Sequence, residues 1–205
     1  MTNTLDLNPL IEFANQDAKQ KNFAALLGNS KEGREYGKLV VDCCQKIPEN
    51  QGFYIWGKYE ENGLWRTIYL GKAGFGKMTS LRARITEELK DERPFLWTGK
   101  HTGYEAKQVK KIWEEIYSDG SQQKVAQNHI IRSLRKKGTT HIIWHTTPNL
   151  NNQEVNRIES DLIETLNPIA NVQRPAPVSD LQDYTVKVIR SFKQNIHANR
   201  LWYEK

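Results

Sequence analysis

The sequence predicts an α+β fold in which a small antiparallel three-stranded sheet is flanked by helices. Two observations indicate the sheet: an alternating hairpin pattern over residues 52–72 and a β-branched and aromatic run over residues 139–146. A third observation, a series of amphipathic segments around these runs, indicates the helices. We expect a helical N-terminal arm (1–50), a main domain (51–173) with a helical insertion at about 91–138, and a C-terminal helical extension (174–205).

Composition bounds the class of protein. At 205 residues the chain can bury a core without disulfide bonds. The net charge is +6, and the basic excess is concentrated in residues 72–138, which hold 15 Lys and Arg against 8 Asp and Glu. This asymmetry favours a polyanionic partner, with nucleic acid the first candidate and a solvated basic face the alternative.

Cysteine use and hydropathy indicate the compartment. Cys43 and Cys44 are adjacent, and neighbouring Cα atoms about 3.8 Å apart are too close for an ordinary disulfide. The chain has no basic start followed by an apolar run, and no segment reaches the roughly 20 apolar residues of a membrane span. We therefore expect a cytoplasmic protein with no membrane partner.

The first 50 residues read as mostly helical. The apolar spacing predicts one helix around Leu10–Leu27 and a second around Glu32–Lys46, and Pro48 ends the arm before the first strand. No residue pattern in this arm carries chemistry, so we expect it to pack on the main domain or to contact a partner.

Residues 52–72 predict a β-hairpin in which Asn62-Gly63 forms a two-residue turn with two positive φ angles. With that turn, Tyr54 lies opposite Gly71, and Trp56 lies opposite Tyr69. One face then carries Tyr54, Trp56, Lys58, Thr67 and Tyr69, and the other carries the core residues Phe53, Ile55, Ile68 and Leu70. The alternative interpretation is that these aromatic residues simply suit a pleated sheet.

The next segment, 71–77, is rich in glycine and leads into a predicted helix at about 79–89, but it lacks the spacing of a P-loop. Leu81, Ile85 and Leu89 form the buried stripe of this helix. Arg84 and Glu88 fall at the edge of the stripe, where they could reach over the sheet. The alternative is that Arg84 only pairs with Glu88 on the surface.

The residue pattern within the insertion predicts helices over 106–117 and 124–137. The second helix ends in the cluster Arg132, Arg135, Lys136 and Lys137, which either complements the helix C-terminus or binds a nucleic-acid backbone. In the strand that follows, His141 and His145 share a face, but they lie roughly 13 Å apart along the strand, too far to ligate one metal.

A helix over 151–166 begins with Asn151 and Glu154 in a capping-box pattern. Its apolar stripe is Val155, Ile158, Leu162 and Leu166. Glu159 falls inside the buried arc, whereas Asp161 and Glu164 point away. A carboxylate in that arc must be paired or hold a cation, and a structural ion pair is the alternative to a functional role. A last helix, from Ser179, buries Leu181, Tyr184, Val188, Phe192 and Ile196.

Four motifs in this order resemble those of the GIY-YIG nucleases. They are Gly52-Phe53-Tyr54, Tyr69-Leu70-Gly71-Lys72-Ala73, Leu81-x-x-Arg84-Ile85, and Glu159-x-x-Leu162-Ile163-x-x-Leu166-x-Pro168-x-x-Asn171. The resemblance covers about residues 52–172. The spacer between the two tripeptides and the stretch between Arg84 and Glu159 are longer than in compact members, and Glu88 stands where many members have a histidine.

The resemblance implies hydrolysis of phosphodiester bonds with one divalent metal, Mg²⁺ or Mn²⁺. Glu159 would be the protein ligand of the metal, whose other positions are taken by water and phosphate oxygens. Tyr54 would accept the proton of the attacking water. Because a tyrosine ordinarily has a pKa near 10, this role requires a neighbouring cation, for which Lys72 is the obvious residue.

The remaining motif residues carry supporting roles by the same resemblance. Tyr69 would orient the water or the phosphate, and Arg84 would neutralise charge that builds up in the transition state. Asn171 would fix the geometry near the site.

A chain of this size with helical additions is most similar to type II restriction endonucleases, so the expected partner is DNA. To cut both strands with one site per chain, such an enzyme forms a homodimer or acts twice, and a companion methyltransferase belongs to the same system. The alternatives are a repair or mobile-element nuclease specific for DNA structure, and a DNA-binding module that does not cleave. The candidate DNA contacts are Lys77, Arg82, Arg132, Arg135, Lys136 and Lys137.

Overall fold

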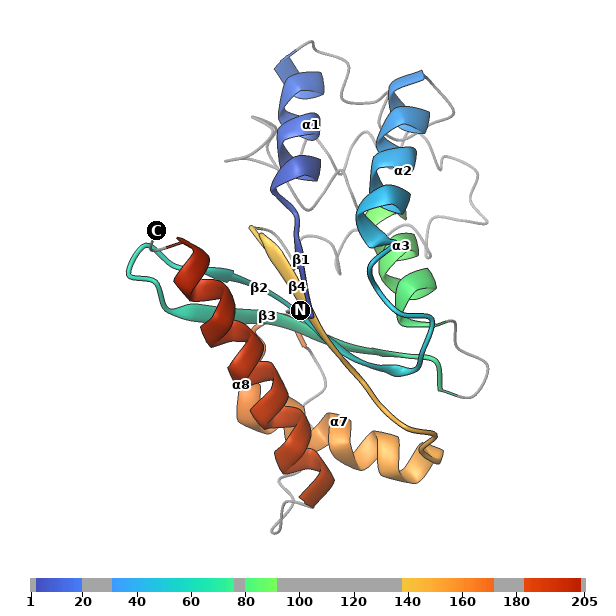
Figure 1. Ribbon diagram of the computed structural model, residues 1–205, viewed down its shortest axis with the longest axis vertical. Helices are drawn as coiled ribbons and strands as arrows, with labels where there is room; N and C mark the ends of the chain where they lie inside the picture. Colours follow the sequence, from blue (N-terminus) through green and yellow to red (C-terminus); the bar gives the residue numbers. More distant parts are fainter. Residues whose placement is uncertain (1–2, 20–30, 76–79, 92–137, 172–182, 204–205) are drawn as a thin grey trace, which may run out of the picture. The chain divides into compact units, whose positions relative to one another are not determined.

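The computed structural model describes residues 3–19, 31–75, 80–91, 138–171 and 183–203 of the chain (Figure 1). By its internal contacts the chain divides into two compact units. The first comprises Met1–Asp6, Lys46–Arg84 and Thr140–Lys205, and the second comprises Leu7–Gln45 and Ile85–Thr139. The first unit contains the sheet and every named residue of the four sequence motifs except Ile85.

The sheet is antiparallel throughout and has the strand order β1-β4-β2-β3. Its strands are β1 (Thr4–Asp6), β2 (Gly52–Tyr59), β3 (Trp65–Ala73) and β4 (His141–Thr146). The α+β class is confirmed, but the predicted count of three strands is wrong. The additional strand, β1, lies in the arm that we expected to be mostly helical, and it pairs with β4 along Thr4, Leu5 and Asp6.

The hairpin of β2 and β3 has the predicted pairing around its tyrosines, with Tyr54 opposite Gly71 and Trp56 opposite Tyr69. The predicted two-residue turn is wrong. Glu60 pairs with Leu64 through its backbone N–H, and the Gly63 N–H returns to the Glu60 carbonyl, so the loop has three residues. Gly63 is the residue of this loop with a positive φ, 75°. Three-residue hairpin loops usually end in a residue of this left-handed conformation, which glycine adopts easily.

A β-bulge compensates for the longer loop. Gly57 pairs with Thr67 while Trp56 pairs with Tyr69, so Ile68 is an extra residue on β3. On the loop side of the bulge the faces are exchanged relative to our prediction. Thr67 accepts a hydrogen bond from the Trp65 indole at 2.9 Å and lies on the face of Trp65, not on the face of the tyrosines.

Two helices, α7 (Asn152–Leu166) and α8 (Asp183–Tyr203), cover one face of the sheet (Figure 1). The capping box of α7 is present as predicted, since the Asn151 side chain accepts from the Glu154 N–H and the Glu154 carboxylate accepts from the Asn151 N–H. Between the helices and the sheet lies one hydrophobic cluster, made of Phe53, Ile55, Leu70, Phe75, Ile143, Val155, Ile158, Leu162, Ile163, Val188, Ile189 and Phe192.

In the second unit, α1 (Asn8–Lys19) and α2 (Lys31–Cys44) pack through Phe13 and Tyr36, whose ring centroids are 6.0 Å apart. The Tyr36 hydroxyl donates to the Leu89 carbonyl of α3 (Leu81–Asp91) at 3.3 Å. The predicted insertion helices lie outside the described residues. Among the helices that are described, none is long and apolar enough to cross a membrane.

Candidate active site

An ion pair at the edge strand brings together two of the predicted site residues. Lys72 of β3 places its Nζ atom 2.7 Å from Glu159 Oε2 on α7, and it also donates to Asn156 Oδ1 at 2.9 Å. Both side chains of the ion pair are about one quarter exposed, 22% for Lys72 and 27% for Glu159. The pair is therefore open to solvent and can be reached by an external anion or cation.

The two tyrosines, Tyr54 of β2 and Tyr69 of β3, lie on the face of the hairpin opposite to that of Lys72. Their ring centroids are 6.4 Å apart. The side chain of Tyr54 lies across Gly71: a Cβ atom built on Gly71 would lie 2.5 Å from the Tyr54 hydroxyl oxygen. The hydroxyl is thereby placed beside the residue that precedes Lys72. Tyr54 is buried, with 1% exposure, and Tyr69 is half-buried, so a substrate reaches the Tyr54 hydroxyl only after its surroundings move.

Asn171 secures the outer edge of β3. Its side-chain amide makes two hydrogen bonds with Leu70, accepting from the backbone N–H at 2.9 Å and donating to the carbonyl at 3.0 Å. The chain reaches this position because Asn167 adopts the left-handed conformation, with a φ of 45°, and ends α7. The Ala170 N–H then donates to the Ile68 carbonyl. Asn171 thus supports the strand between Tyr69 and Gly71, a structural role for this residue.

Arg84 is held by the first turn of α3, which is anchored to the segment before β2. The Leu81 N–H donates to the Asn50 carbonyl, and the Leu81 side chain packs where Gly52 has no Cβ atom. Arg82 donates to the Ile47 carbonyl at 2.6 Å and pairs with Glu49 at 2.7 Å. Arg84 is half-buried and its Nε atom is fully enclosed. This turn therefore holds the Arg84 backbone in a fixed position in the first unit.

Three predictions about carboxylate burial are wrong. Asp161, expected to point away from the core, is 1% exposed and accepts a hydrogen bond from the buried Thr185 hydroxyl at 3.0 Å, whereas Glu159 stays partly exposed. Glu88, expected at an open edge, is 3% exposed. For α7 the reason is that α8 packs beside it, so the covered arc is wider than the apolar stripe in the sequence.

Most of the predicted DNA contacts lie outside the described residues: Lys77, Arg132, Arg135, Lys136 and Lys137. The sixth, Arg82, is described. Its guanidinium bonds both to Glu49 and to the backbone of Ile47, so it holds the start of α3 in place. A phosphate contact by Arg82 stays a prediction.

The donor set around Glu159 limits the kind of metal that the site can hold. Across the described parts of the chain, no group of three or more His, Cys, Asp or Glu side chains is arranged to hold a metal ion. Lys72 bonds to one carboxylate oxygen of Glu159, Oε2, and no described residue bonds to the other. A single partly exposed carboxylate suits Mg²⁺, which keeps several waters and shares substrate phosphates, and it does not suit a closed structural site.

Asn156 is a site residue that the sequence analysis missed. It precedes Glu159 by three positions on α7, so the two side chains share one helix face, and both bond to the Lys72 ammonium group. Polar residues three positions before a candidate ligand on the same helix are the signal that would have identified it. Comparisons of the chain with protein-family models, with curated proteins and with solved structures found no match.

Proposed function

We propose that this chain is an endonuclease of the GIY-YIG type that hydrolyses DNA phosphodiester bonds with Mg²⁺ or Mn²⁺, in the manner of a restriction enzyme. The observation that carries the proposal is the Lys72–Glu159 ion pair at the strand edge, one residue from the Gly71 that lies under the Tyr54 hydroxyl. It joins two of the four ordered sequence motifs in one place. The exposed position of the pair supports access by a phosphate group.

In the proposed reaction each side chain has one task. Tyr54 accepts the proton of the attacking water, and Lys72 favours that transfer by its positive charge. Glu159 holds the metal ion, which, when bound, supplies Lewis-acid polarisation of the phosphate. Arg84 offsets the negative charge of the transition state, and Tyr69 orients the phosphate or the water.

The placement of Lys72 supports a further step in this scheme. Its ammonium group already compensates Glu159 when no other cation is present, which keeps a partly buried carboxylate from standing unpaired. A metal ion held by Glu159 would compete with Lys72 for the same carboxylate, so Lys72 would then be free to offset negative charge on a bound phosphate.

The test is cleavage of long unmethylated DNA by the purified full chain, with Mg²⁺ or with EDTA. We expect discrete fragments that require the metal, and we expect Glu159→Gln to abolish them while DNA binding is kept. The matched control is Glu164→Gln, because Glu164 is an exposed carboxylate on the same helix. Cleavage by Glu159→Gln at the wild-type rate would falsify the role of Glu159.

The same experiment distinguishes the alternatives. Nicking of branched or damaged DNA alone, without fragments from linear DNA, would favour a structure-specific repair or mobile-element nuclease. DNA binding that is equal with Mg²⁺ and EDTA, without any cleavage, would favour a binding module of the same fold. A restriction enzyme further predicts a homodimer on DNA and a companion methyltransferase.

A further inference from the structure

Helix α8 turns a basic face away from the sheet. Its apolar residues, among them Val188 and Phe192, are buried in the hydrophobic cluster, so the opposite side of the helix is the outer one. That outer side carries Lys187, Arg190, Lys193, Gln194 and His197, all of them exposed. None of the proposed catalytic residues lies on this helix.

Among the described residues, none forms an ion pair with the cations on this face. Asp183 begins the helix, and the sequence has no further acidic residue until Glu204. Within the described residues, no acidic side chain forms an ion pair with Lys187, Arg190 or Lys193, although Lys31, Lys58, Arg66 and Arg82 each form one. The outer face of α8 therefore has a positive charge that an external partner can compensate.

The spacing of these charges matches a phosphate backbone. At about 1.5 Å of rise per residue, Lys187 and Lys193 lie about 9 Å apart along the helix axis. Phosphates of one DNA strand follow one another at about 3.4 Å along the duplex axis. The three cations thus span about three phosphate intervals.

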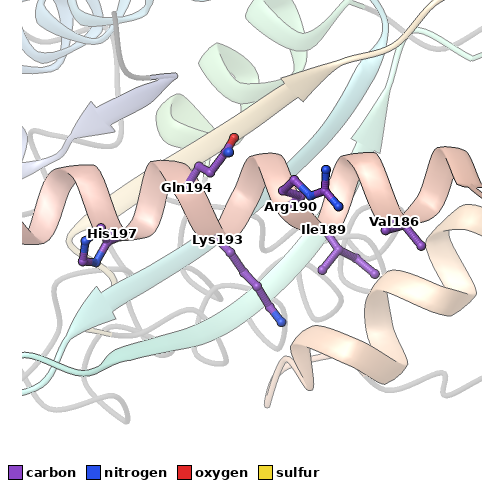
Figure 2. Close-up of a pocket in the computed structure, with 6 residues that line it drawn as sticks. All are labelled: Val186, Ile189, Arg190, Lys193, Gln194 and His197. Carbon is purple, nitrogen blue, oxygen red and sulfur yellow. The ribbon is translucent and has the colours of Figure 1, made fainter.

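The same face is hollowed. A groove of about 420 Å³ is lined by Val186, Ile189, Arg190, Lys193, Gln194 and His197 (Figure 2). In Figure 2, Arg190 and Gln194 project to one side of the α8 axis and Lys193 projects to the other. Ile189 projects to the same side as Lys193, so charged and amide donors lie on both sides of the helix axis beside apolar side chains.

An anionic membrane is a poorer fit than nucleic acid for this surface. A helix that lies in a lipid interface needs an exposed apolar face opposite its cations. The apolar face of α8 is used in the core, and among the large hydrophobic side chains described on the helix only Val186 is exposed, at 37%. Over the helix residues whose side chains are described, the surface therefore offers charge and hydrogen-bond donors, which suit phosphates, and little that could insert into lipid.

We propose that the outer face of α8 is a binding surface for the backbone of duplex DNA. It acts through Lys187, Arg190 and Lys193 and is independent of DNA sequence. This inference goes beyond the proposed function, because it concerns binding by an element outside the four motifs. It places a DNA contact in a part of the chain other than the basic stretch over residues 72–138.

The test measures binding of the full-length Glu159→Gln protein to a mixed-sequence duplex in EDTA, by fluorescence anisotropy over a range of salt concentrations. The charge-removing variant is Lys187→Gln with Arg190→Gln and Lys193→Gln. We expect at least a tenfold loss of affinity at low salt. We also expect the slope of log affinity against log salt to fall by roughly 2 to 3, since each lost phosphate contact removes about 0.9.

The matched control keeps the charge and exchanges the side chains, Lys187→Arg with Arg190→Lys and Lys193→Arg, and it should bind as the parent does. A single Arg190→Gln variant should lower the slope by about 1, which keeps the test decisive if the triple variant unfolds. A slope unchanged by the triple variant, or a parent that does not bind DNA, would overturn the proposal. Loss of binding to phosphatidylserine vesicles with DNA binding unchanged would overturn it in favour of a membrane surface.

Failure of this inference and failure of the proposed nuclease give different results. If wild-type protein with Mg²⁺ leaves every DNA substrate intact while the salt slope still depends on the three α8 cations, the nuclease assignment falls and the α8 surface stands. If DNA is cleaved normally and the salt slope does not depend on the three α8 cations, the nuclease assignment stands and the α8 surface falls.

Discussion

At the scale of single residues, the contact between Gly71 and Tyr54 explains why a glycine occupies this place in the strand. The phenol ring lies across Gly71, where any other residue would place a Cβ atom into the ring. The φ angle of Gly71 is not positive, so its absent side chain matters for space and not for backbone conformation. The position of the Tyr54 hydroxyl thus depends on its cross-strand partner.

Gly71→Ala should therefore displace Tyr54. We expect a loss of about 1–3 kcal/mol in the free energy of unfolding, as is typical of overpacking, measured by urea denaturation. If Tyr54 is the proposed proton acceptor, the rate of DNA cleavage should also fall, because the Tyr54 hydroxyl is displaced from its position beside Gly71.

The control for this variant is the same change in a Tyr54→Ala background. There the added methyl group has room, so the two destabilisations should not be additive, as expected for residues in contact. Additive losses would mean that Gly71 acts on something other than the Tyr54 ring.

For single residues, the sequence predicted the shared face of the two tyrosines but not the burial of the carboxylates on α7. That the two tyrosines share one face agrees with the alternation of strand side chains, although the turn used to predict their register was wrong. The burial of Asp161 was not predictable, because a helical wheel identifies the apolar stripe and cannot show that a second helix covers the neighbouring arc. Glu159 was expected inside the buried arc and is instead 27% exposed; its ion pair with Lys72 is the structural alternative to a functional role, and its role as a metal ligand stays a prediction.

At the scale of elements, a buried polar contact joins α7 to α8. The Thr185 hydroxyl of α8 donates to Asp161 Oδ2 of α7, and the two residues are 0% and 1% exposed. The contact links the helix that carries Glu159 to the helix that carries the basic outer face. Its loss leaves a polar group in the core without its partner, which costs more than the hydrogen bond itself contributes.

Thr185→Val should therefore destabilise the protein by about 1–3 kcal/mol, because the Asp161 carboxylate loses its donor while the shape of the side chain is kept. Urea denaturation measures the change. Thr185→Ser keeps the hydroxyl and serves as the control. The double variant with Asp161→Leu should recover part of the loss, and no recovery would show that Thr185 acts by packing alone.

The pairing of the two tyrosines in the hairpin was predicted correctly, although the loop length was wrong and the bulge was not foreseen. The three-residue loop shifts the strand pairing by one residue relative to the prediction, and the bulge at Ile68 shifts it back. The two shifts cancel at the tyrosines, and Thr67, between the loop and the bulge, shows the difference. Strand β1 escaped prediction because three residues are too few for an alternating pattern. Its pairing depends on β4 and on Asn195 of α8, whose side chain accepts from the Asn3 N–H.

At the scale of the whole molecule, two histidines couple folding to pH. His141 and His145 lie on β4, on the side of the sheet that faces α8, where the first contacts the rings of Tyr59 and Trp65 and the second those of Tyr184 and Phe192. Burial lowers the pKa of both imidazoles below the usual value. For His141, the charge of Asp6 opposes this effect and that of Lys46 adds to it, so that the pKa stays lowered.

The lowered pKa values fix the sign of the pH dependence. Below about pH 6.5 the unfolded chain takes up protons at both positions and the folded protein does not, so the free energy of unfolding falls as the pH falls. Each histidine contributes a slope of at most about 1.4 kcal/mol per pH unit, and the slope levels off once the pH drops below the folded pKa. We expect urea denaturation to show lower stability at about pH 5.5 than at about pH 7.5. His145→Gln should flatten this dependence, because it removes one of the two imidazoles whose pKa is lowered. Equal stability at both pH values would mean that the two buried imidazoles are protonated in the folded protein as readily as in the unfolded chain.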